Sequence, residues 1–67
     1  MSILNKNIKF YRLQESMTQE KLAERLGLDR TTIVKYESGE HEPSIQTLIE
    51  LANIFDITLD ELVGREP

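Results

Sequence analysis

Residues that typically begin and end helices divide the chain into short segments. Four of them favour the N-cap position and precede apolar residues: Thr18, Asp29, Ser44 and Thr58. A side-chain oxygen at this position can accept a hydrogen bond from a free backbone N–H of the first helical turn. Gly27 and Gly39 follow two of the segments, where a residue without a Cβ can take the left-handed conformation that ends a helix. The spacing of these capping residues predicts several short helices rather than a few long ones.

Apolar residues recur within two of these segments at the spacing of one helical face. Residues 3–15 place Leu4, Ile8 and Tyr11 at positions i, i+4 and i+7. The segment that starts at Ser44 has a predicted buried stripe formed by Ile45, Leu48, Leu51, Ala52 and Phe55. Both segments are therefore predicted to be amphipathic helices that bury one side.

Three shorter helices complete the predicted fold. Two of them span about residues 18–26 and 30–38. The last begins with a capping-box pattern at residues 58–61 and ends before Gly64. No segment alternates between apolar and polar residues, so no sheet is expected. The sequence predicts an all-α fold of five helices.

Length and composition exclude several classes of protein. A chain of 67 residues forms at most one domain, whose core is expected over about residues 4–63. No stretch approaches the roughly 20 apolar residues of a membrane-spanning helix, so neither a membrane protein nor a secretory signal is expected. The absence of Cys excludes disulfides and thiol nucleophiles and agrees with a cytoplasmic location.

Candidate residues for metal binding or catalysis are few. His41 is the single histidine, and no second His or Cys lies at a ligand spacing, so a turn residue is the better interpretation. Asp60 and Glu61 are adjacent carboxylates, but neighbours on a helix point in different directions, and capping explains them better than acid catalysis. No metal, cofactor or small-molecule effector is expected, and the chain is not predicted to be an enzyme.

The net charge of −4 conceals an asymmetry along the chain. Residues 1–36 carry seven Lys and Arg against four Asp and Glu, a net +3, whereas residues 37–67 carry one against eight, a net −7. An acidic protein is at first a poor partner for nucleic acid, because binding gains from Lys and Arg that neutralise phosphates. The basic half can still face a polyanion if the acidic half faces away from it.

Two of the predicted helices, residues 18–26 and 30–38, are joined by a tight turn centred on Gly27, as in a helix-turn-helix motif. Their shared core is expected to contain Leu22, Ala23, Leu26, Leu28, Ile33 and Tyr36. In the second helix only Ile33 and Tyr36 clearly face inward, so its other side projects from the body. A helix about 10 Å across matches the major groove of B-form DNA, roughly 12 Å wide.

Several segments form a combined pattern: Thr18 to Ala23, Gly27, Ile33, Tyr36 to Gly39, Pro43 with Ser44, and Leu48 to Ala52. Together they resemble the Cro/C1-type helix-turn-helix family of phage repressors and their bacterial relatives. The resemblance covers about residues 4–63 and implies a lambda-repressor-like fold. It also implies a sequence-specific regulator of transcription, in particular a repressor, that binds a two-fold symmetric operator in double-stranded DNA as a homodimer.

The resemblance implies base contacts for one set of residues. In this family the first exposed residues of the recognition helix, and one residue a turn later, touch base edges; here they are Arg30, Thr31, Thr32 and Lys35. Arg30 and Lys35 can donate to guanine O6 and N7, and the two threonines can bond to bases or phosphates. The alternative interpretation is an ordinary solvated helix face.

A second set of residues is expected to contact the DNA backbone. By the same resemblance Gln19 reaches a phosphate beside the free N–H groups at the start of its helix, which Thr18 caps. Ser44, Gln46 and Thr47 begin a helix at a place where relatives also contact the backbone. Phosphate contacts of this kind fix the position of the protein on the duplex and carry little sequence information.

Arg12 and Glu37 match a pair that the family uses as a partly buried ion pair between its first and third helices. Such a pair would fix the recognition helix relative to the body of the domain.

Two segments of the chain depart from the family pattern. Ser16 stands where glycine is common, and the turn at residues 40–42, often basic in relatives, reads Glu-His-Glu. This turn should repel DNA unless it points away.

A homodimer requires an apolar contact surface. The C-terminal segment is the first candidate, because it holds more apolar side chains than a short helix can bury: Ile57, Leu59, Leu62 and Val63. The alternative is a strip formed by Ile3, Phe10 and Leu13.

A protein-interaction module, such as the antitoxin of a toxin pair, is the alternative function. An antitoxin usually has an additional segment that wraps around its toxin, and only residues 65–67 lie outside the predicted domain. DNA binding is therefore the preferred hypothesis.

Overall fold

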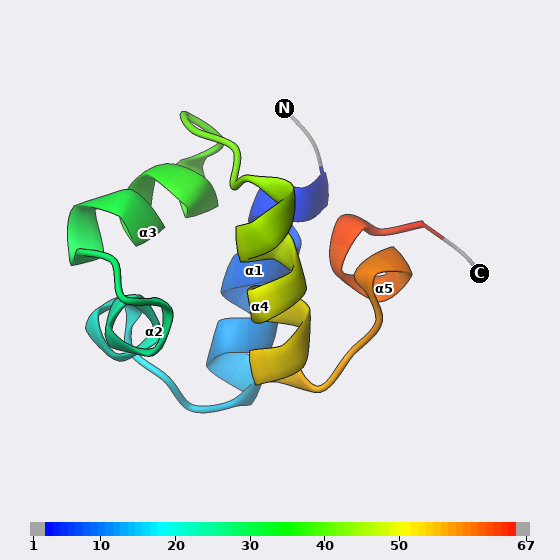
Figure 1. The fold of residues 1–67 in the computed structure, drawn as a ribbon, viewed down its shortest axis with the longest axis horizontal. Helices are drawn as coiled ribbons and strands as arrows, with labels where there is room; N and C mark the ends of the chain where they lie inside the picture. The colour runs from blue at the N-terminus through cyan, green and yellow to red at the C-terminus, as the bar shows by residue number, and fades with distance from the viewer. Residues whose placement is uncertain (1–2, 66–67) are drawn as a thin grey trace.

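A computed structural model describes residues 3–65, and within this range it contains five helices and no strand. They are α1 (Ile3–Gln14), α2 (Gln19–Leu26), α3 (Arg30–Ser38), α4 (Ile45–Phe55) and α5 (Leu59–Val63). Figure 1 shows α1 and α4 at the centre, α2 and α3 on one side of them and α5 on the other. The predicted all-α fold is confirmed, and its helix-turn-helix pair lies on the side away from α5. In the part of the chain that is described, no helix is long and apolar enough to cross a membrane.

The predicted N-caps explain where four of the helices begin. Side-chain oxygens of Thr18, Asp29, Ser44 and Thr58 each accept a hydrogen bond from the backbone N–H three residues later, at 3.0–3.2 Å. Glu61 completes the capping box, because its carboxylate accepts the Thr58 N–H at 2.9 Å. Each cap contributes about 1 kcal/mol to helix stability. The helix starts are therefore local properties of the sequence.

Left-handed backbone ends several of the helical segments. Gly27 has φ 70° after α2, and Asp56 has φ 58° after α4. Ser16, in the turn between α1 and α2, has φ 57°. A non-glycine residue in this conformation costs roughly 1–2 kcal/mol, so Ser16 adopts at some cost in stability a conformation that glycine would adopt more easily.

The core lies where α1, α2, α3, α4 and α5 meet. Its buried apolar residues are Leu4, Ile8, Leu22, Ala23, Ile33, Tyr36, Leu51, Ala52, Phe55 and Leu62. Tyr11 is half-buried, and its ring stacks on that of Phe55 with centroids 5.9 Å apart. All five helices are thus joined through one core, so the orientation of α2 and α3 is fixed by the rest of the domain.

Two expected core residues lie at the surface instead. Ile45 is 66% exposed, because it lies on the same side of α4 as the exposed Ile49 and burial declines toward this end of the helix, where Leu48 is only half-buried. Leu28 is 37% exposed, because it belongs to the turn between α2 and α3 and lines an open groove beside them. The predictions of burial at Ile45 and Leu28 are therefore wrong.

Candidate nucleic-acid interface

A tight turn sets the angle between α2 and α3. Gly27 ends α2 in the left-handed conformation, and its N–H donates to Glu24 O at 3.2 Å. The next residue, Leu28, donates its N–H to Ala23 O at 2.8 Å. Asp29 then caps α3, so that one helix ends and the other begins within three residues. A side chain at position 27 would meet nothing within 4 Å, and the positive φ is therefore the reason for glycine here.

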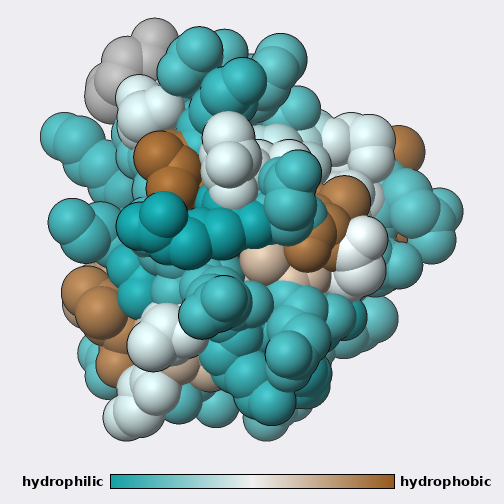
Figure 2. Space-filling model, turned by 90° about the vertical axis from the view of Figure 1, so that its left-hand side faces the viewer, coloured by the Kyte–Doolittle hydropathy of each residue, from teal (hydrophilic) through white to brown (hydrophobic). Residues whose placement is uncertain are grey.

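The outward side of α3 carries the residues that the resemblance assigns to base contacts. Arg30 and Thr31 are exposed, and Thr32 and Lys35 are half-buried. The opposite side of the helix buries Ile33 and Tyr36 in the core. Figure 2 views the molecule from the side of α2 and α3, and hydrophilic side chains cover most of this face with small separated apolar spots.

Thr32 also takes part in the cap at the start of α3. Its hydroxyl donates to Asp29 Oδ1 at 2.7 Å, and its backbone N–H donates to the same oxygen at 3.0 Å. The hydroxyl hydrogen bond, followed by the backbone one, holds the pKa of the Asp29 carboxyl below its usual value. Because the hydroxyl proton is used in the cap, Thr32 retains only its acceptor lone pairs and its methyl group for contact with a base.

The candidate phosphate contacts lie at two helix starts. Thr18 and Gln19 lie at the first turn of α2, and Ser44, Gln46 and Thr47 at the first turn of α4. Thr18 accepts a hydrogen bond as a cap, which leaves its hydroxyl proton free to donate. Ser44 donates to Thr47 Oγ1 at 3.2 Å, so the free hydroxyl proton of that pair belongs to Thr47. Free backbone N–H groups at both starts add donors suited to an anion.

Arg12 and Glu37 form the expected ion pair between α1 and α3. Arg12 Nε lies 2.6 Å from Glu37 Oε2, and Arg12 Nη2 donates to Oε1 at 3.2 Å. The side chains of Arg12 and Glu37 are 8% and 6% exposed. Arg12 Nη1 also donates to Met17 O at 2.7 Å, in the turn before α2. The pair thus joins the end of α1, the approach to α2 and the end of α3.

Three further long-range contacts involve side-chain amides that the sequence did not single out for this purpose. Gln19 Nε2 donates to Glu37 Oε1 at 3.1 Å, although the resemblance assigned Gln19 only to a phosphate. Asn5 Nδ2 donates to Glu37 O at 3.2 Å. Asn7 Nδ2 donates to Leu62 O at 3.0 Å and so holds α5 against α1. Contacts between residues this far apart in the chain leave no local signal in the sequence.

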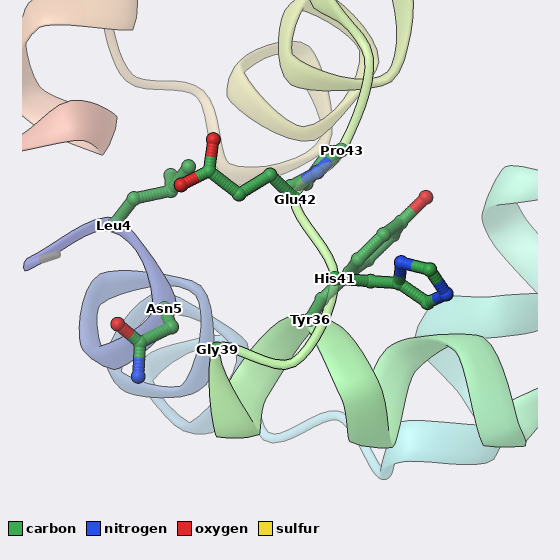
Figure 3. Close-up of a pocket in the computed structure, with 7 residues that line it drawn as sticks. All are labelled: Leu4, Asn5, Tyr36, Gly39, His41, Glu42 and Pro43. Carbon is green, nitrogen blue, oxygen red and sulfur yellow. The ribbon is translucent and has the colours of Figure 1, made fainter. Parts of the chain in front are cut away.

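A small cavity lies behind the loop between α3 and α4. Figure 3 shows its lining, which α1, α3 and the loop contribute: Leu4, Asn5, Tyr36, Gly39, His41, Glu42 and Pro43. Its volume of ≈ 30 Å³ suits about one water molecule and is far below the several hundred Å³ of a ligand pocket. Asn5 Oδ1 is buried without a hydrogen-bond partner among the described residues. Among those residues no group of three metal-ligating side chains comes together.

The acidic turn is exposed, and the residues predicted to form a dimer differ in their burial. Glu40, His41 and Glu42 are exposed in the loop after α3. Of the C-terminal candidates, Leu59 is 37% exposed and Ile57 and Val63 are half-buried. Leu62 is fully buried, because it is the residue through which α5 enters the core, so the prediction that it lies on a dimer surface is corrected.

Comparisons with known proteins agree with this fold. Residues 8–62 match a family model described as helix-turn-helix. The chain is 39% identical over 64 residues to the uncharacterized HTH-type transcriptional regulator YqaE of Bacillus subtilis, covering 96% of this chain and 55% of that protein. It is 42% identical over 48 residues to the cryptic phage CTXphi transcriptional repressor RstR of Vibrio cholerae, covering 72% of this chain and 43% of the repressor. The chain therefore spans about half the length of these two relatives.

A solved structure shows the same arrangement of helices. The P22 c2 repressor protein, crystallised with the synthetic operator 9T, superposes with a TM-score of 0.87 and covers 98% of this chain and 100% of that one. Its sequence identity of 21% makes this a likeness of fold. The fold and the turn between α2 and α3 define a helix-turn-helix domain. The chain belongs to the Cro/C1-type helix-turn-helix family of transcriptional regulators, which is not a family of enzymes.

Proposed function

We propose that this domain binds double-stranded DNA sequence-specifically, with α3 in the major groove, and that it acts as a transcriptional repressor in the cytoplasm. The observation that carries the proposal is the outward face of α3. It presents Arg30, Thr31 and Lys35, while the other side of the helix is held in the core and its end is tied to α1 by a buried ion pair. The likeness to the RstR repressor supports repression as the direction of regulation.

The first turns of α2 and α4 support a set of contacts to the DNA backbone. Thr18 and Gln19 at α2, and Ser44, Gln46 and Thr47 at α4, are proposed to bind phosphates. These residues present hydroxyl, amide and backbone N–H donors without a positive charge. The proposed interface therefore depends on hydrogen bonds to phosphate more than on ion pairs, in keeping with the modest +3 of residues 1–36.

Selection of bound duplexes from a pool of random sequence is the experiment that tests the proposal. We expect a short enriched motif in two copies related by two-fold symmetry and spaced by about one DNA turn, roughly 34 Å. Recovery of sequences with no common motif would contradict sequence-specific binding. A single unrepeated half-site would contradict the homodimer but not sequence-specific binding.

We expect Arg30→Ala and Lys35→Ala each to relax base preference at particular positions of the selected site, by about 1–3 kcal/mol. Both side chains project from the groove-facing helix, so losing one should matter only where it meets a base. Affinities for the site, for single-base variants of it and for random duplex provide the measurement. Gln19→Ala is the control: a residue that contacts the DNA backbone and no base should, when removed, weaken binding to all duplexes alike. Equal losses on every duplex for all three variants would show that α3 does not read bases.

We also propose a homodimer that forms through exposed apolar side chains away from α3. Leu59 of α5 is one candidate, with Ile57 and Val63 beside it in the chain. The alternative is the α1 strip, where Phe10 is 52% and Leu13 56% exposed. We expect sedimentation with the selected duplex to show two protomers for each symmetric site, and one protomer at saturating protein would reject the dimer.

A further inference from the structure

The buried carboxylate of Glu37 binds two different partners. Its Oε2 accepts from Arg12 Nε, and its Oε1 accepts both from Arg12 Nη2 at 3.2 Å and from Gln19 Nε2 at 3.1 Å. The ion pair alone would explain the contacts of Arg12. The bond to Gln19 has no part in balancing charge, and Gln19 is also the residue proposed to meet the DNA backbone.

The positions of these three residues give the bond to Gln19 a geometric consequence. Gln19 is the first residue of α2 and is half-buried, whereas Glu37 lies near the end of α3 and is 6% exposed at its side chain. Arg12 fixes the carboxylate from α1 and also holds the turn before α2 through Met17 O. The Gln19 amide is therefore held by a carboxylate that Arg12 fixes through two hydrogen bonds.

The chemistry of the two side chains determines which way the amide faces. A carboxylate accepts hydrogen bonds only, whereas a side-chain amide has two N–H donors on nitrogen and an acceptor oxygen. Glu37 therefore selects the orientation in which the nitrogen of Gln19 faces the carboxylate. An unconstrained glutamine would present its oxygen to a phosphate in part of its conformations, and two acceptors repel each other.

We propose that Glu37 is a positioning residue for DNA-backbone binding: by accepting one N–H of Gln19, it leaves the second N–H directed outward, ready to donate to a phosphate. This inference rests on the proposed function. Because the amide is ordered before DNA arrives, binding avoids the cost of fixing a flexible side chain. The same carboxylate thus serves the Arg12 ion pair and the alignment of a residue at the DNA-facing start of α2.

The first test is whether the two residues are coupled in DNA binding. Affinity for a fluorescent random-sequence duplex is measured for the parent, Gln19→Met, Glu37→Gln and the double variant, well below the unfolding temperature of each. We expect Gln19→Met to weaken binding by about threefold or more in the parent, the size of one hydrogen bond. In the Glu37→Gln background the same change should cost less than about twofold, because an amide at position 37 can present either its oxygen or its NH2 group to Gln19 and no longer selects one orientation. An equal cost in both backgrounds would overturn the inference while leaving DNA binding in place.

The second test uses the DNA-free protein and needs no substitution at Glu37. We expect the side-chain amide protons of Gln19 to be rigid and slow to exchange in nuclear magnetic resonance spectra. Gln14 and Gln46 are exposed and serve as internal controls with freely moving amides. A Gln19 amide as mobile as these controls would overturn the inference. A parent protein that binds no duplex would instead reject the proposed function, and the inference with it.

Discussion

Glu37→Ala should lower the free energy of unfolding by about 3–5 kcal/mol, because it leaves Arg12 buried without its partner. The arginine is 7% exposed, and a guanidinium does not shed its proton to escape the low-polarity environment. A chain of this size has a total stability of roughly 3–10 kcal/mol, so the variant should be partly or fully unfolded near 37 °C. Urea or thermal unfolding followed by circular dichroism measures the effect.

The matched control for this prediction is the exposed pair on α2. Lys21 and Glu24 lie 3.1 Å apart with side chains 57% and 71% exposed, and Glu24→Ala should change stability by less than about 0.5 kcal/mol. Arg12→Ala combined with Glu37→Ala should cost less than the sum of the single changes, since no lone charge then remains buried. Losses at Glu37 as small as those at Glu24, or strict additivity, would mean that the ion pair does not hold α3 in place.

Local features of the structure could be predicted from sequence with good accuracy. The N-caps at Thr18, Asp29 and Ser44 depend on contacts within three residues, so the sequence pattern contains the whole interaction. Gly27 likewise marks the end of α2 through its own backbone preference. The helix-turn-helix could be found because its turn and its inward residues, such as Ile33, are close together in the chain.

Burial at the ends of elements could not be predicted in the same way. Ile45 fits the apolar period of α4 but lies at an end of the helix where its side is left uncovered. Leu62 and Leu59 belong to the same short helix, and only the position of α5 against α1 decides that the first is buried and the second is half exposed. The periodicity of a sequence indicates which side of a helix faces inward, but the neighbouring elements decide how far along the helix the burial extends.

The candidate site shows the same difference between local features and contacts that depend on the tertiary structure. The outward-facing positions of α3 follow from its helical period, whereas the bond from Gln19 to Glu37 joins residues on different helices. The sequence suggested a different role for each of these polar residues, so nothing in it indicated that they contact each other. The tertiary structure adds this pairing, and with it a physical link between the ion pair and the proposed DNA-backbone contact.

Leu62→Ala should lower the free energy of unfolding by about 2–5 kcal/mol, the usual cost of truncating a fully buried leucine. Leu62 is 0% exposed and is the buried residue of α5, whose start is fixed by the capping box and whose end Asn7 holds. In a domain of this size each kcal/mol shifts the melting temperature by roughly 4–8 °C, so thermal unfolding detects the change clearly. Leu59→Ala is the matched control in the same helix, and because its side chain is 37% exposed it should cost less than about 1 kcal/mol.

The same pair of variants separates stability from assembly. Because Leu62 belongs to the core, Leu62→Ala should weaken the folded protomer at every protein concentration, and the loss should not depend on dilution. A loss that grows with protein concentration would contradict this expectation, because a dimer contact exists only where protomers associate. Melting curves over a hundredfold range of protein concentration provide the measurement. Leu59→Ala should show the opposite pattern if α5 forms the dimer contact, with a small effect on the dilute protein and a larger one when it is concentrated.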